Sequence, residues 1–380
     1  MAEPVRVLEL LVSTGIGGGP AHVRDLVAAL PREEFDVTVA GPAGGLHVDE
    51  FRALGAAFVE VAADRLSVGA LLRVIRLIRE RRIAVVHSHG KGAGLYGRLA
   101  AWWTGIAAIH TFHGIHHERY PRQYLRLERC LARHSYAVVH VSPSQAGQAE
   151  SLGLAPERRS LVIVNATDPA RIRAAAAREP LSREALGWAA DAPVLGTVAR
   201  FDAVKGLDVL LRAFARTLER LPAARLLVVG DGPEAAALRA LAGSLALGDR
   251  VTFTGAVADA ARCLPVLDLY VSASRREGLP LAMMEAMACG LAVLATRVPG
   301  HVDLVEEGVT GVLVPADDPA ALADAAVTLL QDPARRRAMG AAGRQRVEAH
   351  FTMAPMVSRV AALYREAARF PEGWPHLPGV

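Results

Sequence analysis

The sequence predicts an α/β protein built from two doubly wound, Rossmann-like domains that face a central cleft. Short runs rich in Val, Ile and Leu alternate with amphipathic segments along the chain, which is the pattern of parallel strands covered by helices on both faces. This alternation occurs twice, once in each half. The length of 380 residues also exceeds what one ordinary hydrophobic core serves.

The N-terminal half contains seven strand-like apolar runs separated by helical patterns. The expected strands are Val5–Val12, Phe35–Ala40, Ala57–Val61, Ile83–His87, Ile106–Thr111, Tyr136–Val141 and Ser160–Val164. Among the helical patterns between them are Ala21–Leu30, Val68–Arg82 and Pro121–His134. A parallel sheet with helices on both faces is therefore expected here.

The second half repeats this plan with six further runs. These are Val194–Val198, Arg225–Val229, Val251–Phe253, Leu269–Val271, Ala292–Ala295 and Gly311–Val314. We expect the N-terminal domain over residues 1–170, the C-terminal domain over 171–350, and a linker near Pro169–Pro193. Residues 351–380 should form a helix, Met353–Ala368, that crosses back toward the N-terminal domain, followed by a loosely ordered Pro-rich tail.

The composition describes a globular protein, with 52% hydrophobic and 22% charged residues. Cys130, Cys263 and Cys289 lie far apart without C-x-x-C spacing, which argues against a disulfide framework or structural zinc and fits a reducing cytoplasm. We expect no signal peptide, and the longest apolar run, Leu99–Ile109, is too short to cross a bilayer. The net charge of +4 permits peripheral contact with an anionic membrane, and we expect no nucleic-acid partner.

The most informative stretch runs from Arg276 to Gly290. An apolar strand is followed by the turn Gly278-Leu279-Pro280, and Pro280 suits the start of a helix. Free backbone N–H groups at such a helix start favour an anion. Because Glu277 and Glu285 supply a carboxylate on each side, the pattern suits a sugar nucleotide, which carries hydroxyl groups at both ends of a diphosphate.

Arg200 ends one strand of the second half, and Lys205-Gly206 precedes the next helix. Two cations at the mouth of a parallel sheet could neutralise a departing diphosphate; the alternative is two solvated surface charges. The chain has no Asp-x-Asp pair to hold Mg²⁺ or Mn²⁺. We therefore expect the site to work without a metal ion.

In the first half, Gly17 and Gly18 belong to a glycine loop between the first strand and the first helix. The loop could admit a phosphate or sugar, or it is simply a tight turn. It is not a nicotinamide fingerprint, because Pro20 stands where that motif requires glycine. His113 follows a strand and is followed by glycine, so it could bind a sugar hydroxyl, unless it is one loop histidine among many.

Two further patterns have weaker interpretations. His87 and His89 end another strand, and we interpret them as structural, since two histidines without a third ligand are weak evidence for a metal. Over residues 116–134, Tyr120, Tyr124, Leu127 and Leu131 form an apolar stripe opposite a stripe of arginines. This segment is an ordinary surface helix or a basic helix that lies on anionic lipid.

The order of these motifs resembles that of the retaining glycosyltransferases of the GT-B fold, glycosyltransferase family four. Besides the motifs above, the resemblance includes Val141–Ala146 (Val-Ser-Pro-Ser-Gln-Ala), Asn165 and Gly308–Val314. It runs from about Val5 to Phe370. The sequence departs from the family pattern at Ala199, at Pro299-Gly300 and at Asp303, which affects loop geometry more than chemistry. Asn165-Ala166-Thr167-Asp168 also replaces the usual Asn-Gly-Val-Asp.

The resemblance implies a UDP- or GDP-type sugar as donor, no cofactor and no metal. It implies the following roles: Glu285 for the ribose hydroxyls, Glu277 for the sugar hydroxyls, Gly278, Leu279 and Pro280 for the turn around phosphate and sugar, Arg200 and Lys205 for the diphosphate, Gly17 and Gly18 for the first-domain loop, and His113 as the active-site histidine.

The expected reaction begins with the donor on the second domain and closure of the first over it. The diphosphate leaves, and the acceptor hydroxyl captures an oxocarbenium-like sugar on the same face, with a leaving phosphate oxygen as base. A saccharide or lipid-linked acceptor from envelope or capsule assembly fits the resemblance. Two alternatives stay open: a sugar-nucleotide epimerase, and a catalytically silent subunit that binds nucleotide sugars.

Overall fold

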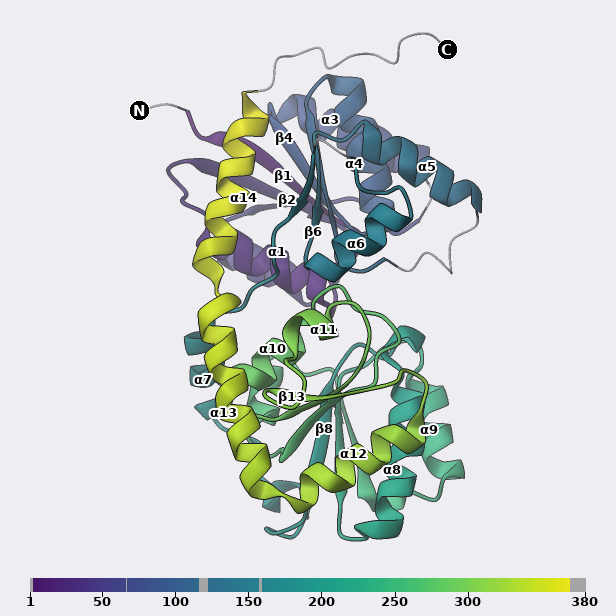
Figure 1. The fold of residues 1–380 in the computed structure, drawn as a ribbon. Coiled ribbons are helices and arrows are strands. Elements are labelled where there is room, and N and C mark those ends of the chain that lie inside the picture. Colours follow the sequence, from purple (N-terminus) through teal and green to yellow (C-terminus); the bar gives the residue numbers. More distant parts are fainter. Residues whose placement is uncertain (1–2, 66, 116–121, 157–158, 370–380) are drawn as a thin grey trace. The chain divides into compact units, whose positions relative to one another are not determined.

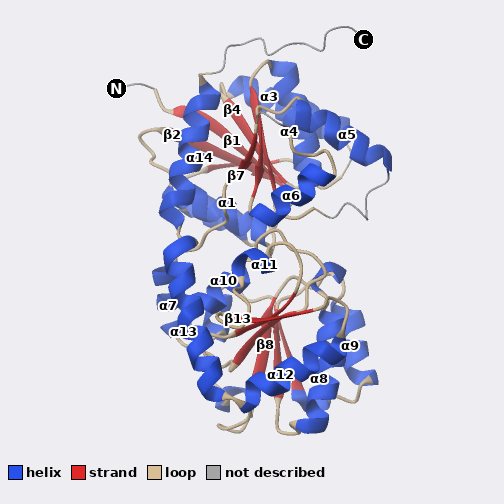
Figure 2. Cartoon of the chain, in the orientation of Figure 1, coloured by secondary structure: helices blue, strands red, loops and turns tan. Residues whose placement is uncertain are grey.

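The computed structural model describes residues 3–65, 67–115, 122–156 and 159–369. The chain divides into two compact units, one formed by Met1–Asn165 with Met353–Val380 and the other by Ala166–Thr352. Each unit is a parallel sheet flanked by helices (Figures 1 and 2). The predicted fold class, two doubly wound α/β domains, is confirmed.

The first unit has a seven-stranded sheet in the order β3-β2-β1-β4-β5-β6-β7, with every neighbouring pair parallel. The strands are β1 Val5–Leu11, β2 Phe35–Gly41, β3 Ala57–Glu60, β4 Val85–His89, β5 Ala107–Phe112, β6 Ala137–His140 and β7 Ser160–Val162. The helices are α1 Gly18–Ala29, α2 His47–Ala53, α3 Val68–Glu80, α4 Lys91–Thr104, α5 Arg122–Arg133, α6 Pro143–Ser151 and α14 Met353–Ala368.

The second unit has a six-stranded parallel sheet in the order β10-β9-β8-β11-β12-β13. The strands are β8 Val194–Val198, β9 Arg225–Val229, β10 Val251–Gly255, β11 Leu269–Ser272, β12 Val293–Thr296 and β13 Gly311–Val314. The α-helices are α7 Pro169–Ala177, α8 Leu207–Arg220, α9 Ala235–Ser244, α10 Leu281–Ala288, α11 His301–Leu304, α12 Pro319–Gln331 and α13 Pro333–His350.

Side-chain alternation on β1 separates two parts of the first unit's core. Leu8 and Leu10 join the cluster under α3 and α4, whereas Leu11 packs with residues of α1 and α2. Glu9 projects to the same side as Leu11 because successive side chains of a strand alternate between the two faces. Helix α14, yellow in Figure 1, contacts α1 and β1 on that side and buries Tyr364 completely. The Glu9 carboxylate therefore lies among the buried apolar side chains of β1.

The predicted linker near Pro169–Pro193 is wrong, because this segment begins with helix α7 and belongs to the second unit. The Asp168 side chain accepts hydrogen bonds from the N–H groups of Ala170 and Arg171, each at 3.0 Å, and Pro169 occupies the first turn. Asp at the N-cap followed by Pro is a helix-start signal, and the Ala-rich segment after it packs against α10.

The apolar stripe predicted for the arginine-rich helix is only partly correct. Leu131 is buried, but Leu127 is 40% exposed, and Tyr120 lies outside the described residues. The buried face instead includes Glu128, which forms an ion pair with Arg98 of α4 at 2.5 Å. The helix's own periodicity could not reveal this, since the partner cation is on another helix.

Strand order reverses between β1 and β4 in the first sheet and between β8 and β11 in the second. Doubly wound sheets bind ligands outside the carboxyl ends of the strands at such switch points. The loops that follow these strands are therefore the places to look for a site. Among the helices that the structure describes, none combines the length and apolar character needed to cross a lipid bilayer.

Candidate active site

Lys205 and Glu277 meet at the switch point of the second sheet. Lys205 ends a short 3-10 turn, Ala203–Lys205, after β8, and Glu277 lies in the loop after β11. The Lys205 Nζ donates to the Glu277 Oε1 at 2.7 Å, and the Ser274 hydroxyl donates to the same oxygen at 2.7 Å. The structure thus brings together two residues that are 72 positions apart in the sequence.

Glu277 is held as a carboxylate although its side chain is only 9% exposed. Burial alone would raise its pKa, but the charges of Lys205 and His301 and the hydrogen bonds from Lys205 and Ser274 lower the pKa overall. Ser274 and His301 escaped the sequence analysis. His301 is fully buried, with Nδ1 2.7 Å from the Thr296 carbonyl oxygen and Nε2 3.1 Å from the Ser272 hydroxyl.

The loop that carries Glu277 is braced by Arg275. Its guanidinium donates to both carboxylate oxygens of Asp208 at 2.8 Å and to Asp317 at 2.6 Å. Gly206, which follows Lys205, has φ +60, and a Cβ there would lie 2.0 Å from the Ala273 carbonyl oxygen. Only glycine permits this approach of the two loops, so the backbone itself sets the spacing of Lys205 and Glu277.

The turn Gly278-Leu279-Pro280 leads into α10, with Pro280 as the N-cap. Gly278 and Leu279 are buried, so this part of the turn offers backbone rather than side chains. The first N–H groups of a helix have no carbonyl partner within it and can bind an anion. Glu285 lies on α10 and is half-buried.

Arg200 was predicted to end a strand, but β8 ends at Val198 and Arg200 lies in the loop after it, where its ion-pair partner is local. Its guanidinium donates to Asp202 at 2.7 Å, and its side chain is about half exposed, at 48%. Of the two predicted cations, Lys205 therefore pairs with the predicted acid Glu277. Arg200 instead lies at the solvent-exposed side of the loop that follows β8.

In the first unit, Gly17 is the N-cap of α1 and Gly18 begins the helix. A Cβ added at Gly18 would meet no atom within 4 Å, and the backbone there is not in the left-handed region. The fold itself therefore does not require glycine at this position, and a ligand contact at this loop stays the prediction that the resemblance implies.

We expect Gly18→Ala to leave the melting temperature unchanged or slightly higher, since alanine is the better helix residue by up to about 1 kcal/mol. If a ligand approaches this loop, as the resemblance implies, the activity should fall, because the methyl group would stand in its way. Thermal unfolding and initial rates measure both effects. A matched control is Gly147→Ala on α6, where a Cβ also meets nothing within 4 Å; equal rates for the two variants would contradict the interpretation.

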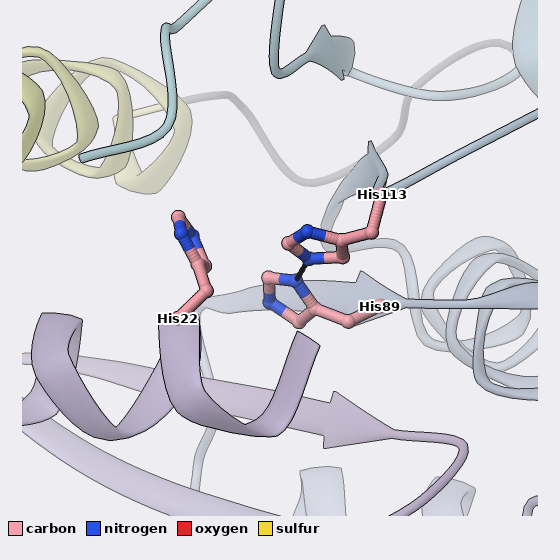
Figure 3. Close-up of side chains that lie close together, drawn as sticks. All are labelled: His22, His89 and His113. Carbon is pink, nitrogen blue, oxygen red and sulfur yellow. Dashed lines mark hydrogen bonds between the residues drawn. The ribbon is translucent and has the colours of Figure 1, made fainter. Parts of the chain in front are cut away.

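His113 follows β5 and lies with two other histidines, His22 from α1 and His89 from the end of β4 (Figure 3). The His89 Nδ1 and the His113 Nε2 are 2.9 Å apart, and the ring centres of His22 and His113 are 5.0 Å apart. Burial, together with the charges of His22 and His89, holds the pKa of His113 well below its usual range. His113 is therefore neutral at neutral pH.

Strand register explains why residues so far apart in the sequence meet. Glu9 of β1 pairs with His87 of β4, and Leu11 pairs with His89. Glu9, His87 and His89 thus project to the same face, and the carboxylate of Glu9 accepts a hydrogen bond from His89 Nε2 at 2.7 Å. The sequence analysis did not identify Glu9, His22 or Tyr364 as site residues. For Glu9, the unusual position of a glutamate within a largely apolar strand could have indicated a role.

His87 and His89 are both buried, in line with a structural interpretation, yet His89 also contacts His113 directly. Among the described residues, two groups could gather around a metal ion, with ligand atoms within 4.8 Å of one another. One is His22, His89 and His113, and the other is Glu9, His87 and His89. A third possible metal ligand, which the sequence pattern around His87 and His89 did not contain, is therefore supplied by residues distant in the sequence.

The fold and these residues define a two-domain α/β protein with the Lys205–Glu277 pair beside the start of α10 at one switch point and a histidine group at the other. Comparison with known proteins gives the family. Residues 192–332 match the group 1 glycosyl transferases, and residues 17–166 match the glycosyl transferase 4-like domain. The chain belongs to glycosyltransferase family four.

Curated relatives agree with this assignment. A D-inositol 3-phosphate glycosyltransferase from Actinosynnema mirum is 31% identical over 326 residues, covering 79% of this chain and 75% of the relative. N-acetyl-alpha-D-glucosaminyl L-malate synthase from Bacillus anthracis is 35% identical over 176 residues, 46% of each chain. A GDP-mannose-dependent mannosyltransferase from Corynebacterium glutamicum is 33% identical over 197 residues, which cover 50% of this chain and 51% of the relative. The chain therefore spans about half the length of these last two relatives.

Solved structures share the fold. HepE from Anabaena, in complex with UDP and glucose, superposes with a TM-score of 0.85 at 21% identity, covering 95% of this chain and all of that one. Sucrose-phosphate synthase from Thermosynechococcus elongatus gives a TM-score of 0.80 at 24% identity, covering 95% and 98%. The GT-B fold expected from the resemblance is confirmed.

Proposed function

We propose that this protein is a retaining glycosyltransferase that moves a sugar from a nucleoside-diphosphate sugar to an acceptor hydroxyl. The observation that carries the proposal is the 2.7 Å contact between Lys205 and Glu277 next to the start of α10. This arrangement supplies a cation and backbone N–H groups for a diphosphate, and a carboxylate for sugar hydroxyls. It lies at a switch point, where such sheets bind ligands.

In the proposed reaction, each side chain of the site has a role set by its charge and by the part of the donor that it contacts. As the bond between the sugar and the diphosphate breaks, negative charge grows on the leaving oxygen. Lys205, Arg200 and the N-terminus of α10 stabilise that charge without a divalent ion. Glu277 binds the sugar hydroxyls, Glu285 binds the ribose, and a phosphate oxygen takes the proton from the acceptor on the face that the diphosphate leaves.

The relatives favour a UDP- or GDP-sugar donor and a saccharide or lipid-linked acceptor. HepE was solved with UDP and glucose, and the Corynebacterium glutamicum relative uses GDP-mannose and a monoacylated phosphatidylinositol mannoside. We extend the proposal to peripheral contact with an anionic membrane on the cytoplasmic side. Arg126, Arg129 and Arg133 of α5 are exposed, and exposed cations on one helix suit an anionic lipid surface. Trp103 at the end of α4 is also 64% exposed.

A panel of UDP-, GDP-, ADP- and TDP-sugars, read by thermal unfolding, tests the proposal. One nucleotide type should stabilise the protein by about 2.7 kcal/mol at 100 times its Kd, equally with and without EDTA. Product formed from the best donor should keep the donor's anomeric configuration, as read by proton NMR.

The other outcomes of this panel are distinguishable. No stabilisation by any nucleotide sugar would overturn the proposal, and an altered sugar nucleotide formed without acceptor would identify an epimerase. Binding without product from any saccharide or lipid-linked acceptor would point to a silent subunit. Loss of binding in EDTA would contradict metal independence.

A further inference from the structure

A buried chain of hydrogen bonds in the first unit ends at His113. The Tyr364 hydroxyl from α14 donates to Glu9 Oε1, and Glu9 Oε2 lies 2.7 Å from His89 Nε2. His89 Nδ1 then lies 2.9 Å from His113 Nε2. Glu9, His89 and Tyr364 are each no more than 2% exposed. These hydrogen bonds are therefore shielded from water as far as His113.

The charge of Glu9 determines which group carries the hydrogen between Glu9 and His89. Burial by itself raises the pKa of Glu9, but the charge of His87 and the hydrogen bonds of His87 and His89 outweigh it and hold that pKa far below its usual range. An ionised carboxylate can only accept hydrogen bonds. His89 Nε2 must therefore carry the hydrogen that lies between His89 and Glu9.

The second proton follows from the first. Burial and the charge of His87 lower the pKa of His89 to about 4, against the opposite effect of Glu9. The ring is therefore neutral at neutral pH and has a single hydrogen, on Nε2. Its Nδ1 is left as an acceptor, so the hydrogen between the two rings belongs to His113 Nε2.

We propose that Glu9, His89 and Tyr364 are positioning residues that present His113 as a neutral acceptor, whose Nδ1 takes a hydrogen bond from a hydroxyl of the transferred sugar. The inference rests on the proposed glycosyl transfer. In Figure 3 the second nitrogen of the His113 ring lies on the side away from His89. His113 then recognises a hydroxyl group and does not donate a proton to the leaving group.

A metal ion shared by His22, His89 and His113 is the competing occupant. Two nitrogens bound to one tetrahedral zinc, with bonds of about 2.0–2.1 Å, lie about 3.3 Å apart, whereas His89 Nδ1 and His113 Nε2 are 2.9 Å apart. That shorter distance is an ordinary N–H···N hydrogen bond. Because His113 Nε2 cannot carry a proton and bind a metal at once, the two possibilities exclude each other.

NMR of the full chain labelled with ¹⁵N-histidine tests the proton order without any substitution. We expect a scalar coupling across the hydrogen bond between His113 Nε2 and His89 Nδ1, with His113 Nδ1 unprotonated. Addition of Zn²⁺ should leave these signals in place. The absence of the coupling, a hydrogen on His113 Nδ1, or a joint shift of His22, His89 and His113 with Zn²⁺ would each overturn the proposal.

Glu9→Gln tests the effect on transfer. An amide can turn either its oxygen or its NH₂ group toward His89, so it no longer dictates the proton order. We expect kcat to fall by about 10-fold to 100-fold, with the Kd for UDP or GDP unchanged, because the proposed nucleotide contacts belong to the second unit. Tyr364→Phe, which keeps the carboxylate, should show a smaller loss of kcat.

The matched control is His140→Gln. His140 is another buried histidine of the same sheet, and its Nε2 contacts Ser160 at 3.0 Å. A wild-type kcat in Glu9→Gln, or equal losses in the Glu9 and His140 variants, would overturn the positioning role while leaving the glycosyl transfer intact. Failure of the wild-type protein to transfer any sugar would refute the proposed function instead, whatever the NMR result.

Discussion

Replacing Lys205 with alanine should slow sugar transfer by a factor on the order of 10² to 10³, the usual effect of removing one group that stabilises a developing anion. Lys205 contacts Glu277 at 2.7 Å with its side chain 26% exposed, so its charge acts where little water screens it. The loss should fall on kcat, because the charge on the leaving diphosphate grows only as the bond breaks.

Two further variants make the Lys205 experiment specific. Lys205→Arg keeps the charge but changes the geometry of the donors, so it should recover part of kcat. Arg220→Ala removes an exposed cation of the same unit, which pairs with Asp324 at 2.9 Å, and should leave kcat unchanged. If Lys205→Ala and Arg220→Ala both transferred sugar at the wild-type rate, Lys205 would have no role in the departure of the diphosphate.

Replacing Glu285 with alanine should weaken nucleotide binding about 10-fold to 100-fold. A hydrogen bond to a charged group contributes about 1.5–3 kcal/mol, and the ribose hydroxyls would lose such a partner on α10. Calorimetric titration with UDP and GDP measures the change in Kd. Because the ribose does not react, kcat at saturating donor should change much less than Kd does.

Glu219→Ala is the control for Glu285, since it removes an exposed carboxylate from α8 of the same unit and should leave Kd unchanged. Glu285→Gln, which keeps a neutral acceptor, should fall between the wild type and Glu285→Ala. An unchanged Kd in Glu285→Ala would refute the ribose assignment, even if Lys205→Ala proved as slow as expected.

The strands were predictable because the evidence for each is local. Val5–Leu11 and Leu269–Ser272 are apolar runs of strand length followed by glycine-containing turns, and this pattern needs no partner to be seen. The pairing of Lys205 with Glu277 was not visible in this way. It depends on how closely two loops approach, which Gly206 and the carbonyl group of Ala273 determine.

Helix α5 and the segment Pro169–Pro193 show where local patterns mislead. On α5, Leu127 fits the apolar period but faces outward, while Glu128 is buried because Arg98 of another helix neutralises it. In the second case, an Ala-rich stretch without a strand was interpreted as a linker. The N-cap Asp168 and the contact with α10 make its first part a helix.

The sequence by itself determined the alternation of strands and helices, the two-domain plan and the strand-turn-helix motif that carries Glu277 and Glu285, because these depend on periodicity and on turns between neighbouring residues. Tertiary structure decided which distant side chains share a proton or a charge. Glu9 and Tyr364 are 355 positions apart, yet they meet beside His89 because parallel register and the return of α14 place them on one buried face. Hydrogen bonds act over about 3 Å of space, whatever the separation along the chain.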